Sequence, residues 1–368
     1  SCADGLEVLA HDFDQNKTTW TPVVEVTRHK WTGRVVTTNQ KWGVVETTPN
    51  HSIYNKDGQT FYPDDKNEVM AVRSVPSSEI LSEIDISKLL ENFVVDADGA
   101  LNEGYTKQVP ENHVRPKMPR FHHSIQAKYN TSKDEIKSLL TMLVWYATEG
   151  HLSDNGIVIS QANVESLQRV QSAIQNISQA EGCITEGSKN DSAYRLEMNS
   201  KIIQLVCENL CGKLSQNKRL PDFVFQLPLD CIEHIFSELM KTDGTTVCNK
   251  DFSEEYKSNF FAYTTVSPIL ASQVGFMATI LNKDYSIYTE TTKSGKTAYK
   301  LRYTKGSGLR GGRHDSCECR TSERDVEDVW VYDIECENIH NFACGVGLVV
   351  CHNTNDPEFQ KLKSNQYM

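Results

Sequence analysis

The sequence predicts a multidomain protein in which the two ends of the chain form a β-rich domain and the middle forms an inserted domain of helices and strands. The first observation is the distribution of charge. The 368 residues carry a net charge of −11, yet residues 120–305 contain 20 basic and 20 acidic side chains, so the excess acid lies entirely at the two ends. The second is that the ends are rich in short β-branched runs, whereas the middle places apolar residues at helical spacing. Because insertions are tolerated where chain ends meet at a surface, a middle with its own composition indicates an inserted domain.

Short strands are predicted along both ends of the chain. Near the N-terminus, the runs Val23–His29, Gly33–Thr38 and Gly43–Thr48 are rich in the β-branched residues that strands prefer. Near the C-terminus, Val329–Cys336 alternates between apolar and polar residues, and Gly347–Cys351 is a final short strand. We expect these strands from the two ends to share one domain.

Two amphipathic helices are predicted in the middle, and each ends in an acidic residue followed by glycine. Apolar residues recur at helical spacing over Ile136–Ala147, before Glu149, and over Ile232–Met240, before Asp243. An ordinary core helix with a glycine C-cap would explain one such ending. Two copies instead fit a tandem repeat of αββαββ units whose paired helices bring the two carboxylates together. Paired carboxylate oxygens suit Mg²⁺, which can activate a water molecule at a phosphodiester.

Composition excludes several classes of protein. Hydrophobic residues make up 38% of the chain, but no run approaches the ~18–20 apolar residues of a membrane span, and no signal peptide opens the chain. The 11 cysteines are odd in number and include no Cys-x-x-Cys pair, which argues against a disulfide scaffold and a zinc ribbon. We therefore expect an intracellular protein with free thiols and no membrane partner. The acidic total also argues against a simple nucleic-acid-binding protein.

The tripeptide His352-Asn353-Thr354 offers a way to cut the chain. The amide nitrogen of Asn353 can attack its own peptide carbonyl, which forms a succinimide and breaks the bond after Asn353. His352 can polarise that carbonyl or protonate the leaving amine. Taken alone, the tripeptide is common and would be read as a surface loop.

Several further motifs accompany this tripeptide along the chain. They are Ser1 with Gly5, Thr48-x-x-His51, Val331-Tyr332-Asp333, His340-Asn341-Phe342 and His352-Asn353-Thr354. Together they resemble the splicing blocks of an intein, and the segments Arg28–Arg34 and Thr48–Tyr54 make the resemblance closest to inteins of family B DNA polymerases. The resemblance implies the all-β Hedgehog/intein (HINT) fold, which both ends of a chain form together. It also implies that the flanking segments of a host protein are partners in cis.

The resemblance assigns the first steps of splicing to three residues near the N-terminus. Ser1 is the nucleophile of an acyl shift that moves the preceding peptide bond onto its hydroxyl group, a covalent step. Thr48 and His51 match the block that destabilises that bond and protonates its nitrogen. No cofactor is implied for splicing.

The later steps are assigned to the C-terminal end. Thr354 Oγ attacks the ester and produces a branched intermediate, and Asn353 then cyclises with the help of His352 and His340. Asp333 matches the block that tunes the nucleophiles. Each residue alone could be structural, but their joint order favours splicing.

The middle of the chain resembles a LAGLIDADG homing endonuclease, the usual passenger of an intein. The two helix ends with Glu149 and Asp243 match its two motifs, which implies that they are catalytic and bind Mg²⁺. The segment Leu210–Phe223 resembles the block between the motifs, and Lys218 matches the active-site lysine that stabilises phosphate charge. The segments Tyr285–Thr291 and Thr297–Thr304 are predicted strands of a surface that would bind double-stranded DNA at the intein insertion site.

These features predict four segments. Residues 1–97 and 306–353 form the discontinuous splicing domain, residues 98–305 a linker and the endonuclease, and residues 354–368 the start of the C-extein. The predicted protein is a monomer that follows its host protein to the cytoplasm or nucleus. An alternative is a splicing intein with an inactive DNA-binding remnant. A secreted Hedgehog-type protein lacks support without a signal peptide, and a DNA-binding module alone would not need the His352-Asn353-Thr354 terminus.

Overall fold

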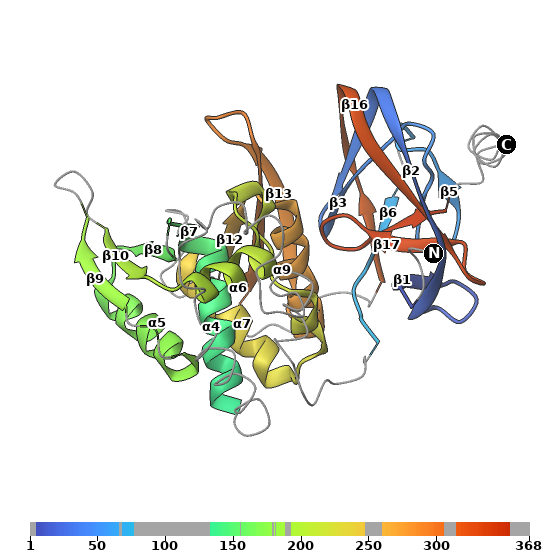
Figure 1. Ribbon diagram of the computed structural model, residues 1–368. Coiled ribbons are helices and arrows are strands. Elements are labelled where there is room, and N and C mark those ends of the chain that lie inside the picture. Colours follow the sequence, from blue (N-terminus) through green and yellow to red (C-terminus); the bar gives the residue numbers. More distant parts are fainter. Residues whose placement is uncertain are drawn as a thin grey trace, which may run out of the picture. The chain divides into compact units, whose positions relative to one another are not determined.

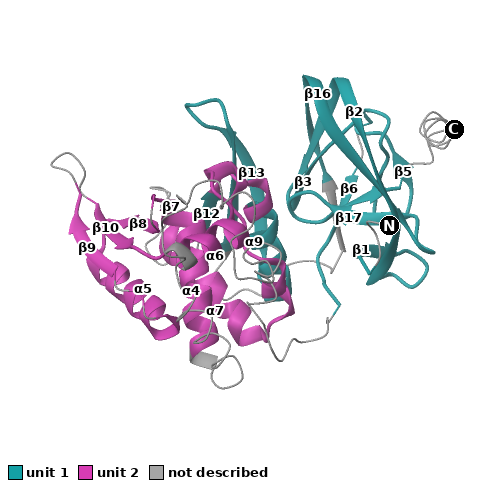
Figure 2. Cartoon of the chain, viewed as in Figure 1, with its two compact units in different colours: residues 1–77, 246–264, 271–368 teal, residues 78–245, 265–270 magenta. Residues whose placement is uncertain are grey.

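The described part of the protein is mixed α/β and forms two compact units (Figures 1 and 2). The computed structural model describes residues 5–65, 68–76, 133–154, 156–178, 180, 182–187, 193–246, 260–304 and 314–353. Unit 1 comprises residues 1–77, 246–264 and 271–368, and unit 2 comprises residues 78–245 and 265–270. Ser1 and Thr354 lie outside the described residues. Among those described, no helix combines the length and apolar character needed to cross a membrane.

Both ends of the chain are β-rich, as predicted, and contribute to unit 1 (Figure 2). The N-terminal strands are β1 (Glu7–Asp12), β2 (Lys17–Gln40), β3 (Gly43–Thr47), β4 (Ile53–Tyr54), β5 (Thr60–Phe61) and β6 (Glu68–Val72). The C-terminal strands are β15 (His314–Glu318), β16 (Arg320–Cys336), β17 (Asn341–Cys344) and β18 (Val349–His352).

Strand β2 is one continuous strand where the sequence predicts two short runs. Its polar stretch around Trp31 remains part of the strand because β16 pairs with β2 both before and after this stretch. The irregularity is taken up instead by β16, whose register shifts between Val326 and Val329 and whose Asp328 has a φ of 51°. The β-branched pattern therefore identified the strand but not its length, because a bulge on the partner strand absorbs the interruption.

Strands from the two ends pair with one another in two sheets of unit 1. One sheet has the order β1-β2-β16, with β3 also on β2, and another has the order β15-β6-β18-β4-β5, with β17 on β18. One buried core cluster likewise combines Ile53 and Val69 from the N-terminal end with Phe342, Val349 and Cys351 from the C-terminal end. Each end therefore lacks part of its core and of its hydrogen-bond partners without the other.

Unit 1 also contains part of the middle of the chain. Strands β12 (Phe260–Thr265), β14 (Thr297–Thr304) and β13 (Tyr285–Thr291) neighbour one another in that order, and most of helix α9 (Pro268–Ile280) belongs to this unit. The bounds of β13 and β14 are those predicted. The fully buried Arg73, just after β6, donates to Asp284 at 3.3 Å and lies over the rings of Trp42 and Tyr285.

The first described element of unit 2 is helix α4, and the described residues of this unit contain a four-stranded sheet of order β7-β8-β10-β9. Its elements are α4 (Lys133–Glu149), β7 (Gly150–Leu152), β8 (Ile157–Gln161), α5 (Val164–Ile177), β9 (Gly182–Glu186), β10 (Tyr194–Met198), α6 (Lys201–Cys211), the short 3₁₀ helices η1 (Ser215–Asn217) and η2 (Asp222–Gln226), α7 (Leu229–Thr242) and the start of β11 (Gly244–Thr246). Among the described elements, the predicted order αββαββ thus occurs twice, from α4 to β10 and from α7 to β14.

Helix α4 is the central helix of unit 2 (Figure 1). The apolar spacing predicts one buried face, but every side chain from Leu139 to Ala147 is buried. The reason is that α5, α6 and α7 all pack against α4. A helix surrounded by other helices has no solvent face to keep polar.

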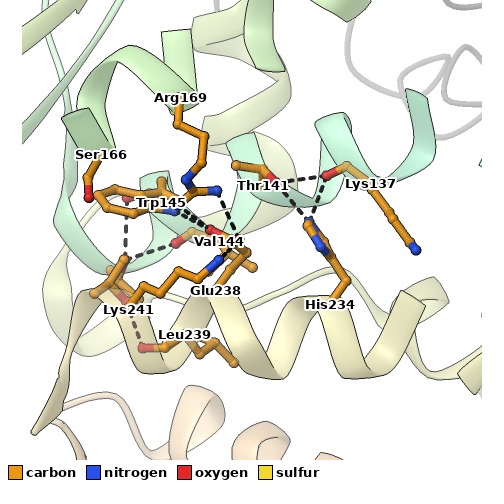
Figure 3. A network of polar contacts seen from close by, with 12 residues as sticks. Lys137, Thr141, Val144, Trp145, Ser166, Arg169, His234, Glu238, Leu239 and Lys241 are labelled. Carbon is orange, nitrogen blue, oxygen red and sulfur yellow. Dashed lines mark hydrogen bonds and ion pairs between the residues drawn. The ribbon is translucent and has the colours of Figure 1, made fainter. Parts of the chain in front are cut away.

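A buried carboxylate ties three of these helices together (Figure 3). Glu238 of α7 is 1% exposed and accepts hydrogen bonds from Trp145 Nε1 of α4 at 2.8 Å and from both Arg169 nitrogens of α5 at 2.7 and 2.9 Å. Lys241 adds a contact of 2.8 Å. Burial opposes ionisation of Glu238, but the hydrogen bonds from Arg169, Lys241 and Trp145 outweigh it and lower its pKa.

A second polar contact joins α4 to α7 one turn away (Figure 3). The Nε2 atom of His234 lies 2.8 Å from Thr141 Oγ1 and 3.1 Å from the carbonyl oxygen of Lys137. Burial is the main reason why the pKa of His234 is lowered. The two contacts fix the rotation and axial position of α7 against α4, and therefore the position of both helix ends.

We predict that Arg169→Met destabilises unit 2 because it removes two hydrogen bonds from a buried, charged acceptor. The free energy of unfolding should fall by about 1.5–3 kcal/mol near neutral pH in urea titrations. The contribution of Glu238 is present above the ordinary glutamate pKa and is lost as the pH falls through its lowered pKa, so the difference from the wild type should shrink in acid.

The matched control is Lys137→Met, which breaks a more exposed α4–α7 ion pair, Lys137–Asp230 at 3.3 Å. Its cost should stay below about 1 kcal/mol. Equal losses in the two variants would contradict the role assigned to the buried Glu238 network.

Candidate functional sites

The loop between β3 and β4 carries two of the predicted splicing residues. The turn is closed by a hydrogen bond of 3.1 Å from the His51 amide to the Thr48 carbonyl oxygen. Burial lowers the pKa of His51, while the charge of Asp333 raises it and that of His352 lowers it further. The imidazole of His51 therefore lies within electrostatic reach of two other predicted site residues, which come from the opposite end of the chain.

Asn353 is buried beside His340 at the end of β18. Its exposed fraction is 5%, its backbone amide donates to the His340 carbonyl oxygen at 3.3 Å, and its Nδ2 atom lies 3.5 Å from His340 Nδ1. Within the described part of the chain, Asn353 Oδ1 is buried without a hydrogen-bond partner. A buried, half-satisfied amide is costly for stability, and such groups are retained where they serve a chemical role.

His352 is held by strand pairing and by an aromatic ring. Its backbone amide donates to the Ser52 carbonyl oxygen at 2.9 Å, and its imidazole stacks on Tyr54 with ring centroids 5.5 Å apart. The Tyr54 hydroxyl donates to the His340 carbonyl oxygen at 3.3 Å. Burial is the main cause of the lowered pKa of His352; its bond with the Asn353 backbone and the charge of Asp333 oppose it, and His340 adds to it.

Asp333 approaches this group of histidines from β16. It is paired with Thr27 of β2, and its Oδ1 atom accepts a hydrogen bond of 2.9 Å from the backbone amide of Ile334. Its negative charge raises the pKa values of His51 and His352 against the effect of burial. The structure thus brings Thr48, His51, Asp333, His340, His352 and Asn353 into one region of unit 1.

Two residues without an assigned role complete this region. Asn341 donates from Nδ2 to the His11 carbonyl oxygen and accepts from the His11 amide with Oδ1, both at 2.8 Å. This pair joins β1 to β17, which are 330 positions apart. Asn341 stands in one of the motifs that resemble splicing blocks, which was the available signal for it. Tyr54 ends the segment Thr48–Tyr54 that carries the resemblance, but no role was predicted for it, because its partners His340 and His352 are far away in the sequence.

A second site lies at the ends of α4 and α7 in unit 2. Burial first, and the negative charge of Asp243 second, raise the pKa of Glu149 to about 7. Burial raises the pKa of Asp243 to about 6. The predicted pair is therefore brought together in a partly desolvated place, where two carboxylates repel each other when ionised.

These two carboxylates fit a magnesium ion. A divalent cation between them would neutralise the repulsion and restore both ionised forms. In the described residues no cluster of three or more His, Cys, Asp and Glu side chains could hold a metal. Two carboxylates are nevertheless sufficient for Mg²⁺, which keeps several waters and completes its coordination with substrate phosphates.

Glycine is required directly after each acid. A Cβ atom on Gly150 would lie 2.6 Å from Tyr146 Cα, and one on Gly244 would overlap the carbonyl oxygen of Met240. In both cases the obstacle is the last turn of the preceding helix, so any larger residue would displace the acidic side chain as well. The acid–glycine pairs are thus constrained by close backbone approach.

Lys218 is buried on the face of Tyr146. Its ammonium group donates to the Tyr146 carbonyl oxygen at 3.0 Å and lies 3.3 Å from the centre of the Tyr146 ring. The Tyr146 hydroxyl is itself fixed by Gly212, and Ser267 holds the Lys218 carbonyl oxygen at 2.6 Å. Burial lowers the pKa of Lys218 to about 8. Tyr146 precedes Glu149 by less than one helical turn, so Lys218 contacts the end of α4 that carries this acid.

Sequence comparison relates the chain to two DNA polymerases. The DNA polymerase of Thermococcus kodakarensis is 27% identical over 205 residues, which cover 43% of this chain and 12% of that protein. The DNA polymerase of Thermococcus hydrothermalis is 27% identical over 198 residues, which cover 42% and 11%. The chain thus matches only about a tenth of each polymerase. No family model matches it.

Three solved structures resemble the chain at low identity. Variants of the homing endonuclease I-DmoI match at 13% identity and a TM-score of 0.33, over 46% of this chain and 90% of theirs. The homing endonuclease I-WcaI bound to its DNA recognition sequence matches at 10% and 0.31, over 54% and 87%. Full-length DUF199/WhiA from Thermatoga maritima matches at 12% and 0.33, over 48% and 52%. These TM-scores do not establish a shared fold.

The resemblance to DNA polymerase inteins that the sequence motifs predict is confirmed by these two polymerase relatives. The match to a limited segment of each polymerase is consistent with an endonuclease-bearing intein.

We predict that Tyr146→Leu lowers the pKa of Lys218, whereas Tyr146→Phe leaves it near 8. The aromatic face favours the charged ammonium by about 1 kcal/mol, so its loss should lower the pKa by roughly half a unit or more. The measurement is an NMR titration of the Lys218 ε-carbon. A rise of the pKa toward that of an exposed lysine in the leucine variant would contradict the assignment.

Proposed function

We propose that the chain is a self-splicing intein whose HINT domain is formed by residues 1–97 and 306–353. The observation that carries the proposal is the burial of Asn353 with its amide nitrogen against His340, at a place where strands from both ends of the chain meet. Host segments are the partners in cis, and residues 354–368 are the start of the downstream segment.

The C-terminal reaction breaks one peptide bond. Asn353 Nδ2 forms a bond to the Asn353 carbonyl carbon, and the bond from that carbon to the Thr354 nitrogen breaks. His340 Nδ1, 3.5 Å from Nδ2, accepts the proton that the amide loses. His352 supplies the proton that the leaving amine gains.

The N-terminal reaction precedes this cleavage. Ser1 Oγ loses its proton and forms an ester with the upstream carbonyl carbon, while the peptide bond to Ser1 breaks and its nitrogen gains a proton. Thr48 and His51 destabilise that bond and protonate its nitrogen. The negative charge of Asp333 raises the pKa of His51, which helps its imidazole to carry the proton that it gives to the freed amine. Thr354 Oγ then displaces Ser1 from the ester, which links the two flanks.

Splicing is tested by adding an upstream host segment and following the products by gel and mass spectrometry. We expect a ligated product from the wild type and none from Asn353→Ala, since the alanine has no nucleophilic amide. Asn176→Ala, an exposed asparagine of α5, is the control and should splice normally. Absence of a ligated flank in the wild type, or splicing by Asn353→Ala, would exclude the proposal.

Cleavage after Asn353 should become faster as the pH falls from 8 to 6. Burial lowers the pKa of His352, so only a small fraction of its imidazole is protonated at neutral pH. That fraction, and a rate limited by proton donation, rises by up to about tenfold per pH unit above the pKa. His352→Ala should be slower and should lose this slope, and a wild-type rate independent of pH would contradict the role of proton donor.

We further propose that the inserted residues 98–305 are a LAGLIDADG endonuclease that binds double-stranded DNA as a monomer. Glu149 and Asp243 would hold Mg²⁺, and the bound ion would polarise the phosphodiester and activate a water molecule. Lys218, fixed on Tyr146, stabilises the charge that develops on the phosphate. The alternative is an inert DNA-binding remnant. The neutral net charge of residues 120–305 argues against an active nuclease, because DNA binding relies on Lys and Arg side chains that neutralise phosphates.

The two alternatives differ in the cleavage of DNA that carries the uninterrupted host site. With Mg²⁺, we expect the wild type to cut and the double variant Glu149→Gln, Asp243→Asn to bind but not cut. Mg²⁺ must displace protons from Glu149 and Asp243, whose pKa values are raised to about 7 and about 6. The Mg²⁺ concentration needed for cleavage should therefore rise as the pH falls below 7. Cutting by the double variant would remove the two acids from the mechanism, and wild-type binding without cutting would support the remnant.

A further inference from the structure

Two thiols are in contact on the hairpin that leads to Asn353. The sulfur atoms of Cys344 and Cys351 are 3.2 Å apart, and both residues are free cysteines. Cys344 ends β17, and Cys351 precedes His352 in β18. The splicing chemistry proposed above uses neither thiol.

The two side chains lie on the same face of the hairpin. Cys351 is paired with Phe342 and Cys344 with Val349, so the two cysteines are diagonal neighbours across β17 and β18. Both contact the core cluster that also contains Cys336 of β16. Their contact is therefore imposed by the register of the hairpin rather than by a flexible loop.

The two thiols differ in accessibility. Cys351 is fully buried, whereas Cys344 is only partly buried. A reagent from solution must therefore meet Cys344 first, and Cys351 can react only with a group already attached to its neighbour.

We propose that Cys344 and Cys351 are a redox-modification site that takes low-molecular-weight disulfides and forms an internal disulfide bond that slows the release at Asn353. The second part rests on the proposed splicing function. The Cys344 thiolate attacks one sulfur of the reagent, forming a mixed disulfide and releasing the first reagent thiol. The Cys351 thiolate then attacks the Cys344 sulfur, forming the internal bond and releasing the second thiol. The two protein thiols are oxidised, the reagent disulfide is reduced to two thiols, and the two protons pass to them.

The bond would restrain the strand that carries the junction. It must bring the sulfur atoms from 3.2 Å to about 2 Å, which draws β18 toward β17. Cys351 is two residues before Asn353, and β18 is also held by the pairing of Cys351 with Ile53. Cyclisation requires Asn353 Nδ2 to approach its own carbonyl carbon, and a cross-linked hairpin gives less freedom for that movement.

The modification is tested on the full chain with oxidised glutathione, followed by peptide mapping under non-reducing conditions. We expect a peptide pair linked through Cys344 and Cys351. Cys351→Ala should accumulate glutathione on Cys344, Cys344→Ala should leave Cys351 unmodified, and the control Cys336→Ala should form the bond normally. Modification of Cys344 in the wild type without a linked pair would overturn the proposal.

The consequence is tested by cleavage after Asn353 in reduced and oxidised protein. We expect cleavage several-fold slower after oxidation, full recovery with dithiothreitol, and no effect of glutathione in the Cys344→Ala variant. Equal cleavage rates in the reduced and oxidised protein would overturn the proposal that the disulfide bond slows cleavage after Asn353. The peptide mapping tests separately whether the bond forms. If the reduced protein does not cleave at all, the splicing function fails, and with it this consequence.

Discussion

The antiparallel pairing of β2 with β16 is the interaction on which unit 1 depends. It joins segments about 300 positions apart, sets Asp333 opposite Thr27, and brings the following hairpin β17–β18 to the N-terminal strands β4 and β6. The entropic cost of closing such a loop grows only by about 0.6 kcal/mol for each doubling of its length, so a long insertion between the strands is tolerated. The twin hydrogen bonds between His11 and Asn341 make a second, independent closure. A domain closed in this way can carry a large passenger and still assemble its own site.

In unit 2, contacts between distant parts of the chain converge on a buried charge. Glu238 is stabilised from three sides, and its partners on α4 and α5 fix the helices whose ends bear Glu149 and Asp243. Those two acids are not stabilised in this way, because burial raises the pKa of both. Buried carboxylates that lower stability while their neighbours are fully satisfied are typical of functional sites.

Local pattern predicted much of the fold. The runs at 285–291 and 297–304 have the bounds of β13 and β14, and the helical spacing gave α4 and α7. The full length of β2 was not predicted, because the bulge that preserves it belongs to β16. The partners Tyr54, Arg169 and Glu238 were also missed, since each acts on residues distant in sequence and periodicity reports only on one element. The sequence motifs named the site residues, but they did not indicate that Lys218 is buried on Tyr146, and Ser1 and Thr354 lie outside the described residues.

In the proposed reaction, the two ends of the chain build a site in which Asn353 attacks its own carbonyl. The most direct measurement is the mass of the chain released by cleavage after Asn353 in ¹⁸O-labelled water. Cyclisation predicts a C-terminal succinimide, one water lighter than the free acid and without label at release, and no such product from Asn353→Ala. A released chain that ends in a labelled free carboxylate from the outset would show hydrolysis and would exclude cyclisation of Asn353.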